Sequence, residues 1–292
     1  MSQSATLTAM QASASSRRRF SISRLIIYII LAILFVTQLY PLLWLLIYSF
    51  KTNEEILSGS FFALPASWQW VNYKDAIGGG LYWKYLTNSV FVTAITIVAV
   101  IVLAAMVAFA ISRFRWKYGQ YVLLLFLLGM MIPLQSTLLP LMIMFKNIDI
   151  LNTRWSIILP YIAFQTPIAV FILSGFFQSI PNEIEESAIV DGAGVWSIFT
   201  RIVLPISVPP VMTVCILTFI NIWNEYVLAA TFISSEKIKT LPFGVYSFVS
   251  QYSVNYGAIG AFLVLGAAPV VIIYFLLAEK ITKGMVAGAV KG

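Results

Sequence analysis

Four of the eleven acidic residues of the chain lie in one twelve-residue stretch that starts at Pro181 and ends at Gly192. Asn182 and Glu185 within it have the spacing of a capping box, which marks the start of a helix. Gly192 is a residue type that commonly ends helices. These signals predict a helix of about nine residues, far too short to cross a membrane. The four acidic residues are Glu183, Glu185, Glu186 and Asp191.

The predicted short helix has the pattern of an interaction element. Ile184 and Ala188 lie four residues apart and form a narrow apolar stripe beside the acidic positions. An exposed amphipathic helix of this kind can enter a groove on another protein or lie on the bilayer surface. Because an acidic face disfavours anionic lipid, we favour a protein partner.

A second group of polar residues lies inside an apolar run. Asn221, Asn224 and Glu225 have i, i+3, i+4 spacing, which predicts that they share one face of a helix. A carboxylate at membrane depth is a functional-site hypothesis by default, and amides and carboxylates hydrogen-bond sugar hydroxyls. Two alternatives stay open: a structural hydrogen-bond cluster between helices, and a solvated glutamate near the outer surface.

Gln135 is a further polar candidate in another apolar run, between Pro133 and Pro140. The two prolines remove backbone donors and are expected to kink the helix, which can turn polar groups toward a cavity. A packing kink without any substrate contact is the alternative, and we favour it slightly.

The residue types exclude several kinds of chemistry. The chain contains no histidine, and Cys215 is its only cysteine. We therefore expect no histidine-based catalysis, no catalytic residues of another kind and no metal site. The phosphate-binding pattern G-x-x-x-x-G-K-[ST] is missing, so we expect no ATP or other cofactor on this chain. The net charge of +7 is typical of cytoplasmic ends of a membrane protein rather than of nucleic-acid binding.

The composition shows which elements must position these residues. Of 292 residues, 60% are hydrophobic and 10% are charged, and the mean hydropathy is +0.92. Soluble domains carry about 25% charged residues, so the fold class is an all-α polytopic membrane protein. Six stretches are long enough to cross the ~30 Å hydrocarbon core. They are Leu25–Phe50, Leu86–Ile111, Tyr121–Phe145, Trp155–Phe177, Ile202–Thr231 and Gly257–Ala278.

Charge asymmetry predicts the orientation of these six spans. Arg17, Arg18, Arg19 and Arg24 precede the first span and favour a cytoplasmic N-terminus. With that orientation, eleven Lys and Arg residues are cytoplasmic and seven external. Six spans then place the C-terminus and the acidic loop 179–201 on the cytoplasmic side as well. The predicted organisation is a cytoplasmic tail (1–24), a transmembrane domain (25–281) and a second cytoplasmic tail (282–292).

The acidic loop also resembles a known signature. Glu186-Ser187-Ala188, three residues, Gly192, nine residues, then Ile202-Val203-Leu204-Pro205 resembles the EAA motif of inner-membrane permeases of ABC importers. Ser187 departs from the family pattern, in which alanine is usual. Further segments from about residue 130 onward resemble the smaller permease subunit of maltose-type carbohydrate importers. They include Ile132-Pro133-Leu134-Gln135, Leu151-Asn152-Thr153 and Trp223-Asn224-Glu225.

The resemblance implies a function and a set of partners. It implies a permease subunit, in the cytoplasmic membrane of a bacterium, that imports a sugar or oligosaccharide. The implied partners are a second permease subunit, two ATPase subunits that bind the ATP, and an external sugar-binding protein. The acidic helix would couple the chain to the ATPase. The implied coupling residues are Glu183, Ile184, Glu186, Ser187, Ala188, Asp191, Gly192, Ile202, Leu204 and Pro205.

The candidate substrate pathway comprises Asn221, Asn224, Glu225 and Gln135. The resemblance weakens the expectation that this chain contacts the sugar directly, because the larger subunit of such importers often supplies most of the sugar contacts. Neutral and acidic sugars both remain open. The competing function is a secondary transporter or channel subunit that works without an ATPase.

Overall fold

The computed structural model describes residues 22–78, 81–114, 116–250 and 252–289. Within these ranges the regular structure is helical, apart from a single antiparallel bridge between Val249 and Val254. The all-α prediction is therefore confirmed for the described part of the chain. Almost all of the predicted tail 1–24 lies outside the described residues, as do residues 290–292. The chain divides into two compact units, residues 1–48 and 49–292.

The first unit contains one described helix, α2 (Ile22–Tyr48). Its 27 residues correspond to about 40 Å at the rise of an α-helix, which is enough to cross a bilayer. From Leu25 onward the helix is predominantly apolar, as the prediction for Leu25–Phe50 requires. Pro41 is the one proline inside it.

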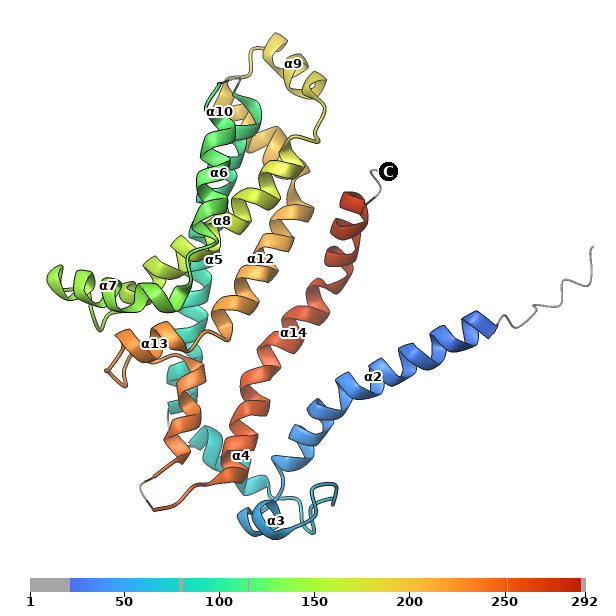
Figure 1. The fold of residues 1–292 in the computed structure, drawn as a ribbon, viewed down its shortest axis with the longest axis vertical. Coiled ribbons are helices and arrows are strands. Elements are labelled where there is room, and N and C mark those ends of the chain that lie inside the picture. The colour runs from blue at the N-terminus through green and yellow to red at the C-terminus, as the bar shows by residue number, and fades with distance from the viewer. Residues whose placement is uncertain (1–21, 79–80, 115, 251, 290–292) are drawn as a thin grey trace, which may run out of the picture. The chain divides into compact units, whose positions relative to one another are not determined.

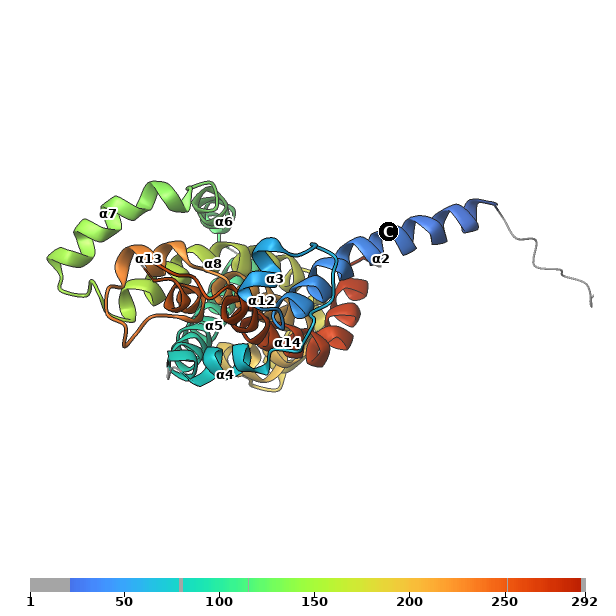
Figure 2. The same cartoon turned by 90° about the horizontal axis from the view of Figure 1, so that it is seen from below.

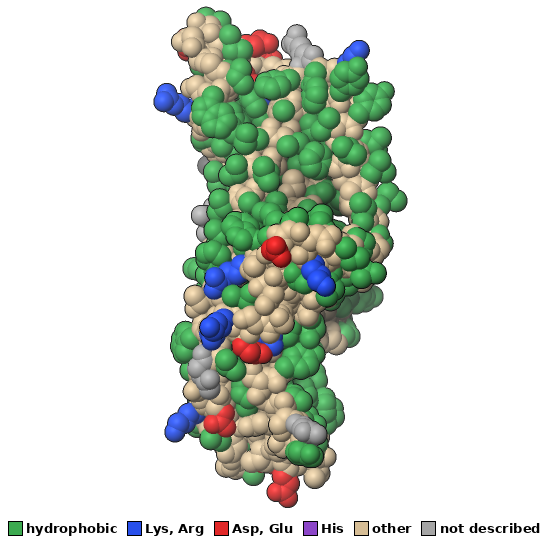
Figure 3. Space-filling view, turned by 90° about the vertical axis from the view of Figure 1, so that its left-hand side faces the viewer, with side chains coloured by type: hydrophobic (Ala, Val, Ile, Leu, Met, Phe, Trp, Pro, Cys, Tyr) green, Lys and Arg blue, Asp and Glu red, His purple; other side chains and the backbone are tan. Residues whose placement is uncertain are grey.

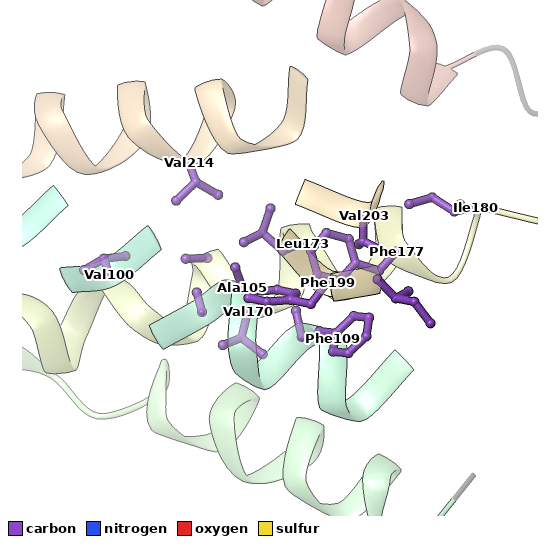
Figure 4. Packing of buried hydrophobic residues seen from close by; sticks show 14 residues of the cluster. Val100, Ala105, Phe109, Val170, Leu173, Phe177, Ile180, Phe199, Val203 and Val214 are labelled. Carbon is purple, nitrogen blue, oxygen red and sulfur yellow. The ribbon is translucent and has the colours of Figure 1, made fainter. Parts of the chain in front are cut away.

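The second unit is built around three long helices, α5 (Leu81–Arg113), α8 (Trp155–Phe177) and α14 (Tyr256–Ala289). Helices α5 and α8 pack together, and Figure 4 shows part of their shared core around Ala105 and Val170. Alanines at such positions allow two helix backbones to approach closely in a membrane. Helix α14 extends through residues 282–289, so this part of the predicted C-terminal tail is helical.

The predicted span Tyr121–Phe145 is not one continuous helix, and the kink expected from its prolines is confirmed at Pro133. It is divided into α6 (Gly119–Gly129) and α7 (Leu134–Asn147), which meet at a bend of 93°. Pro133 lies at the break in an extended conformation, because proline lacks the N–H that would continue the helix and restricts the residue before it. Figures 1 and 2 show α7 running across the direction of α6. The second proline of this region, Pro140, lies inside α7 without ending it.

The predicted span Ile202–Thr231 is also interrupted, because prolines cluster at its start and the helix ends before Asn224. Two parts of it meet at a bend of 75° beside the buried Ser207. Pro205 and Pro210 flank this bend. The helical segments between residues 195 and 232 are α10 (Val195–Ile198), a π-helical turn (Phe199–Val203), α11 (Leu204–Ile206), α12 (Val208–Trp223) and α13 (Val227–Phe232).

Four helices of the described residues are long and apolar enough to cross a membrane, or up to six if each bent pair forms one span. On the face shown in Figure 3, hydrophobic side chains form a broad band, and charged side chains gather above and below it. This is the surface of a membrane protein. The remaining short elements are α3 (Asn53–Ser58), α4 (Trp70–Gly78), α9 (Asn182–Val190) and the 3₁₀ helix η2 (Leu241–Phe248).

Candidate functional site

The short acidic helix is present as α9, but its N-terminus differs from the prediction. Pro181, with extended ψ, occupies the N-cap position and Asn182 is already helical, so the predicted capping box of Asn182 and Glu185 is wrong. Both side chains instead face the end of α5. The Asn182 Oδ1 accepts a hydrogen bond of 2.7 Å from the Arg113 Nη1, and the Glu185 Oε1 lies 2.7 Å from the Arg113 Nε.

The C-terminus of α9 ends as predicted. Gly192 has φ +83°, a left-handed conformation that glycine adopts without a Cβ penalty. The Gly192 N–H donates to the Ile189 carbonyl and the Ala193 N–H to the Ala188 carbonyl, each at 2.9 Å. These two bonds form a Schellman motif. The chain therefore leaves α9 in a fixed direction toward α10.

The residues predicted to couple the chain to an ATPase separate into two groups. Three pack partly buried against the hydrophobic core near Phe177 and Ile198 and so attach the loop to the bundle: Ala188, Ile202 and Leu204. The others are exposed: Glu183, Ile184, Glu186, Ser187, Asp191, Gly192 and Pro205. Because Ser187 is exposed, its departure from the usual alanine does not disturb the packing of the loop.

The exposed apolar face of the loop is not the predicted stripe. Ala188 packs against the core, whereas Val190 is 86% exposed and Trp196 is 65% exposed. Ile189, 59% exposed, lies beside Val190 at the end of α9. Ile184 of the predicted stripe is exposed, but Ala188 is not part of an exposed face because the bundle covers the side of α9 that carries it. The two consecutive apolar residues 189 and 190, shortly before Gly192, indicate in the sequence which residues form the exposed apolar surface of α9.

Glu225, the candidate carboxylate, lies between two helices rather than on one. Helix α12 ends at Trp223, so the predicted common face of Asn221, Asn224 and Glu225 is wrong. The Glu225 Oε1 accepts a hydrogen bond of 2.9 Å from the Leu228 N–H at the start of α13. Its Oε2 accepts one of 2.5 Å from the Tyr161 hydroxyl of α8. The Glu225 carboxylate therefore caps the first turn of α13 and links this helix to α8. This arrangement matches the alternative of a structural hydrogen-bond cluster between helices.

The other candidates of this group have weaker attachments. The exposed Asn221 donates a 3.3 Å hydrogen bond to the Gln165 Oε1 on α8, and the exposed Asn224 donates to the Ile220 carbonyl at 2.9 Å. Gln165 was missed in the sequence, although a glutamine inside an apolar run was a visible signal. Gln135 is exposed in the first turn of α7, and among the described residues no hydrogen bond links it to this group.

The loop before α8 is tied to the loop after α13 by one asparagine. Asn152 has φ +59°, a conformation that asparagine tolerates better than most residues. Its Oδ1 accepts from the N–H groups of Ser234 and Ser235 at 3.0 and 2.9 Å, and its own N–H donates to the Phe232 carbonyl at 3.0 Å. This gives a structural reason for the asparagine in Leu151-Asn152-Thr153.

The break between α6 and α7 borders a pocket of about 420 Å³. Its walls include Leu141 and Phe145 of α7 and Pro160, Phe164 and Pro167 of α8. A wall of this composition offers apolar contact and few partners for hydroxyl groups. The kink therefore matches the packing alternative better than a sugar site.

Comparison with known proteins agrees with this architecture. The family model described as "Binding-protein-dependent transport system inner membrane component" matches residues 100–286, a range that includes α9 and α13. The probable ABC transporter permease protein YurM of Bacillus subtilis is 36% identical, over 94% of this chain and 91% of its own length. The diacetylchitobiose uptake system permease protein NgcG of Streptomyces coelicolor is 34% identical, over 93% of this chain and 89% of its own length.

A solved structure supports the fold independently. The chain is similar to the crystal structure of a bacterial ABC transporter involved in the import of the acidic polysaccharide alginate, with a TM-score of 0.79 and 21% identity. The match covers 91% of this chain and 98% of that one.

Proposed function

We infer the role of this chain from its family: it belongs to the inner membrane components of binding-protein-dependent transport systems. It is a multi-pass permease subunit of an ABC importer in the cytoplasmic membrane, and its cargo is a sugar or oligosaccharide. In the proposed assembly it pairs with a second permease subunit. Two ATPase subunits bind the ATP and an external protein delivers the sugar.

The observation that supports coupling to an ATPase is the exposed helix α9. It is too short to span, and Arg113 attaches one side of it to the bundle. Its outward side presents Glu186 among acidic residues and Val190 as an apolar contact. An amphipathic helix of this kind docks into a groove of a partner protein. In our proposal the groove belongs to the ATPase, with Glu186 bound by a basic side chain.

The proposed topology has six spans, each bent pair counting as one, with both termini and α9 in the cytoplasm. The basic residues before α2, Arg113, which contacts α9, and Lys117 favour this orientation. Asn221, Asn224 and Gln135 remain candidates for the substrate pathway, because their side chains are exposed. In the proposed pathway Glu225 acts chiefly by holding α13 in place.

The test compares two charge reversals of exposed glutamates. Glu186→Lys changes α9, and Glu54→Lys makes the same change in α3, far along the chain from the proposed ATPase contact. We expect Glu186→Lys to reduce the ATPase recovered per permease and the sugar uptake, while Glu54→Lys leaves both unchanged. Membrane insertion and pairing with the second permease should be normal in both variants. Normal ATPase recovery and uptake in Glu186→Lys would refute the proposed contact.

A further inference from the structure

We propose that Arg113 is a positioning residue that transmits the displacement of α9 to α5, and that α5 carries it to the loop 233–240 near its other end. This inference rests on the proposed docking of α9 to an ATPase. It concerns what happens inside the permease after docking, and it depends on contacts that the sequence did not reveal.

Arg113 holds α9 and the chain just before it at three points with one planar group. Its Nη1 donates to the Asn182 Oδ1 at 2.7 Å, its Nη2 donates to the Ile180 carbonyl at 3.0 Å, and its Nε pairs with the Glu185 carboxylate at 2.7 Å. The side chains of Arg113 and Glu185 are only 6% and 13% exposed. A guanidinium with several partners fixes orientation as well as distance.

The charges suit the two helix ends that they join. Arg113 is the last residue of α5, where a positive charge is favourable, and Glu185 lies in the first turn of α9, where a negative charge is favourable. The contact is therefore stabilised by both helices as well as by the ion pair. Since little of it is exposed to water, solvent and salt screen it less than a surface pair.

Helix α5 is suited to carry a displacement along its axis. Among the described helices long enough to cross a membrane unaided, it alone contains neither proline nor glycine in its sequence, whereas α2, α8 and α14 contain prolines. Kinks in helices occur mostly at such residues. The 33 residues of α5 therefore form one continuous element.

The opposite part of α5 is attached to the loop 233–240 in a similar way. The buried Asn88 donates to the carbonyls of Lys237 and Lys239 at 3.0 and 2.9 Å. Its Oδ1 accepts from the Arg154 Nη2 at 2.8 Å. Asn88 and Arg113 are separated by roughly 37 Å at 1.5 Å per residue. A shift of α9 that moves α5 must therefore also move this loop or break its hydrogen bonds.

The experiment uses the complete importer complex with Cys215 replaced by alanine and a fluorophore on Lys237→Cys, an exposed position of the loop. A non-hydrolysable ATP analogue is added, and the fluorescence change is measured together with sugar uptake and ATP hydrolysis. The variants are Arg113→Ala, Arg113→Lys, the single reversals Arg113→Glu and Glu185→Arg, and the charge exchange that combines these two reversals. Lys117→Ala, in the same region, is the control for loss of one positive charge.

We expect Arg113→Ala to keep its ATPase but to lose most of the fluorescence change. The sugar imported per ATP should fall at least about tenfold, because the loss of even one charge-assisted contact corresponds to roughly that factor and Arg113→Ala removes three contacts. Arg113→Lys should be intermediate, and the charge exchange should recover more than either single reversal. Lys117→Ala should behave as the unchanged complex.

Three results would overturn the inference. They are an unchanged fluorescence response in Arg113→Ala, loss of the ATPase from that complex, and an equal effect of Lys117→Ala. If the unchanged chain carries no ATPase at all, the proposed function itself is refuted, which distinguishes the two failures.

Discussion

Gly192 shows how one backbone conformation sets the direction in which the chain leaves a helix. Its φ of +83° is the only positive value among the described glycines, and the space around a Cβ at this position is open within 4 Å. A side chain here would therefore meet no neighbour, and its effect would come from the backbone alone. Gly194, two residues later, also has open space but an ordinary φ of −76°.

Gly192→Val should weaken coupling and Gly194→Val should not. A β-branched residue in the left-handed region costs ~1 kcal/mol or more, which distorts the exit from α9 without unfolding the bundle. We expect Gly192→Val to stay in the membrane with its partner permease while ATPase recovery or sugar uptake falls. Equal values for the two valine variants would contradict this explanation.

Glu225 and Tyr161 should act on stability as a pair. Replacing Glu225 with glutamine or Tyr161 with phenylalanine disrupts the same hydrogen bond, at about 1.5–3 kcal/mol for a bond to a charged group. We expect each single variant to lower the thermal unfolding midpoint of the complex, and the double variant to lower it by less than the sum. Asn224→Ala is the control. Additive effects with altered sugar affinity would instead support a direct substrate role.

Glu236 should make the loop 233–240 sensitive to acid. Hydrogen bonds from Lys239 and from the Tyr85 hydroxyl lower the pKa of Glu236 below its ordinary value of 4.5. The carboxylate therefore stabilises the fold above about pH 4.5, and this stabilisation is lost as the pH falls through the lower folded pKa. The protection of residues 233–240 against hydrogen exchange, taken relative to the intrinsic exchange rate at each pH, should therefore fall in that range, and Glu236→Gln should remove this pH dependence of the protection. A pH-independent protection factor in the unchanged protein would contradict the prediction.

At the scale of elements, apolar run length predicts a helix well only where the run has no break. The span Trp155–Phe177 matches α8 at both ends, even though Pro160 and Pro167 lie inside it. The break at Pro133 was visible in the sequence, but a 93° turn there was not, because run length does not report the direction of a chain. Helix α7 packs against residues of α8 and α13 that are distant in the sequence.

In the candidate site as well, a residue was predictable where its role depends on neighbours in the sequence, and not where its partners are distant in the sequence. Gly192 was predictable because its role depends on its immediate neighbours. Arg113 was not, because its partners at residues 180–185 are 67 or more positions away. Glu225 was recognised as unusual, yet whether Tyr161 or a substrate satisfies it depends on how α8 packs.

The packing of η2 on α14 should depend on a glycine. A Cβ on the buried Gly244 would overlap the ring of Phe262, whereas a Cβ on Gly175 of α8 would meet nothing within 4 Å. Gly244→Ala should destabilise the protein by about 1–3 kcal/mol, the usual effect of overpacking. Gly175→Ala should be neutral or slightly stabilising, because alanine favours helix. Thermal unfolding of the two purified variants tests this, and similar midpoints would contradict it.

At the scale of the whole molecule, two exposed positions can test the proposed orientation. Val190 in α9 is 86% exposed and Tyr252, after η2, is 91% exposed. In a Cys215→Ala background, Tyr252→Cys should react with a membrane-impermeant thiol reagent in intact cells. Val190→Cys should react only after the membrane is opened, in cells that express the permeases without the ATPase. Labelling of both positions in intact cells would refute the topology.

The side chain of Asn53 also constrains the order in which the protein can be completed during synthesis. It donates to the Val254 carbonyl at 3.0 Å and accepts from the Tyr256 N–H at 2.9 Å, so its partners leave the ribosome about two hundred residues later. Gly257 fits closely over Asn72 in the same region. Residues 49–78 therefore cannot complete these contacts until the start of α14 has been synthesised. Stalled nascent chains that end before residue 250 should expose this segment to protease, and chains that include α14 should protect it.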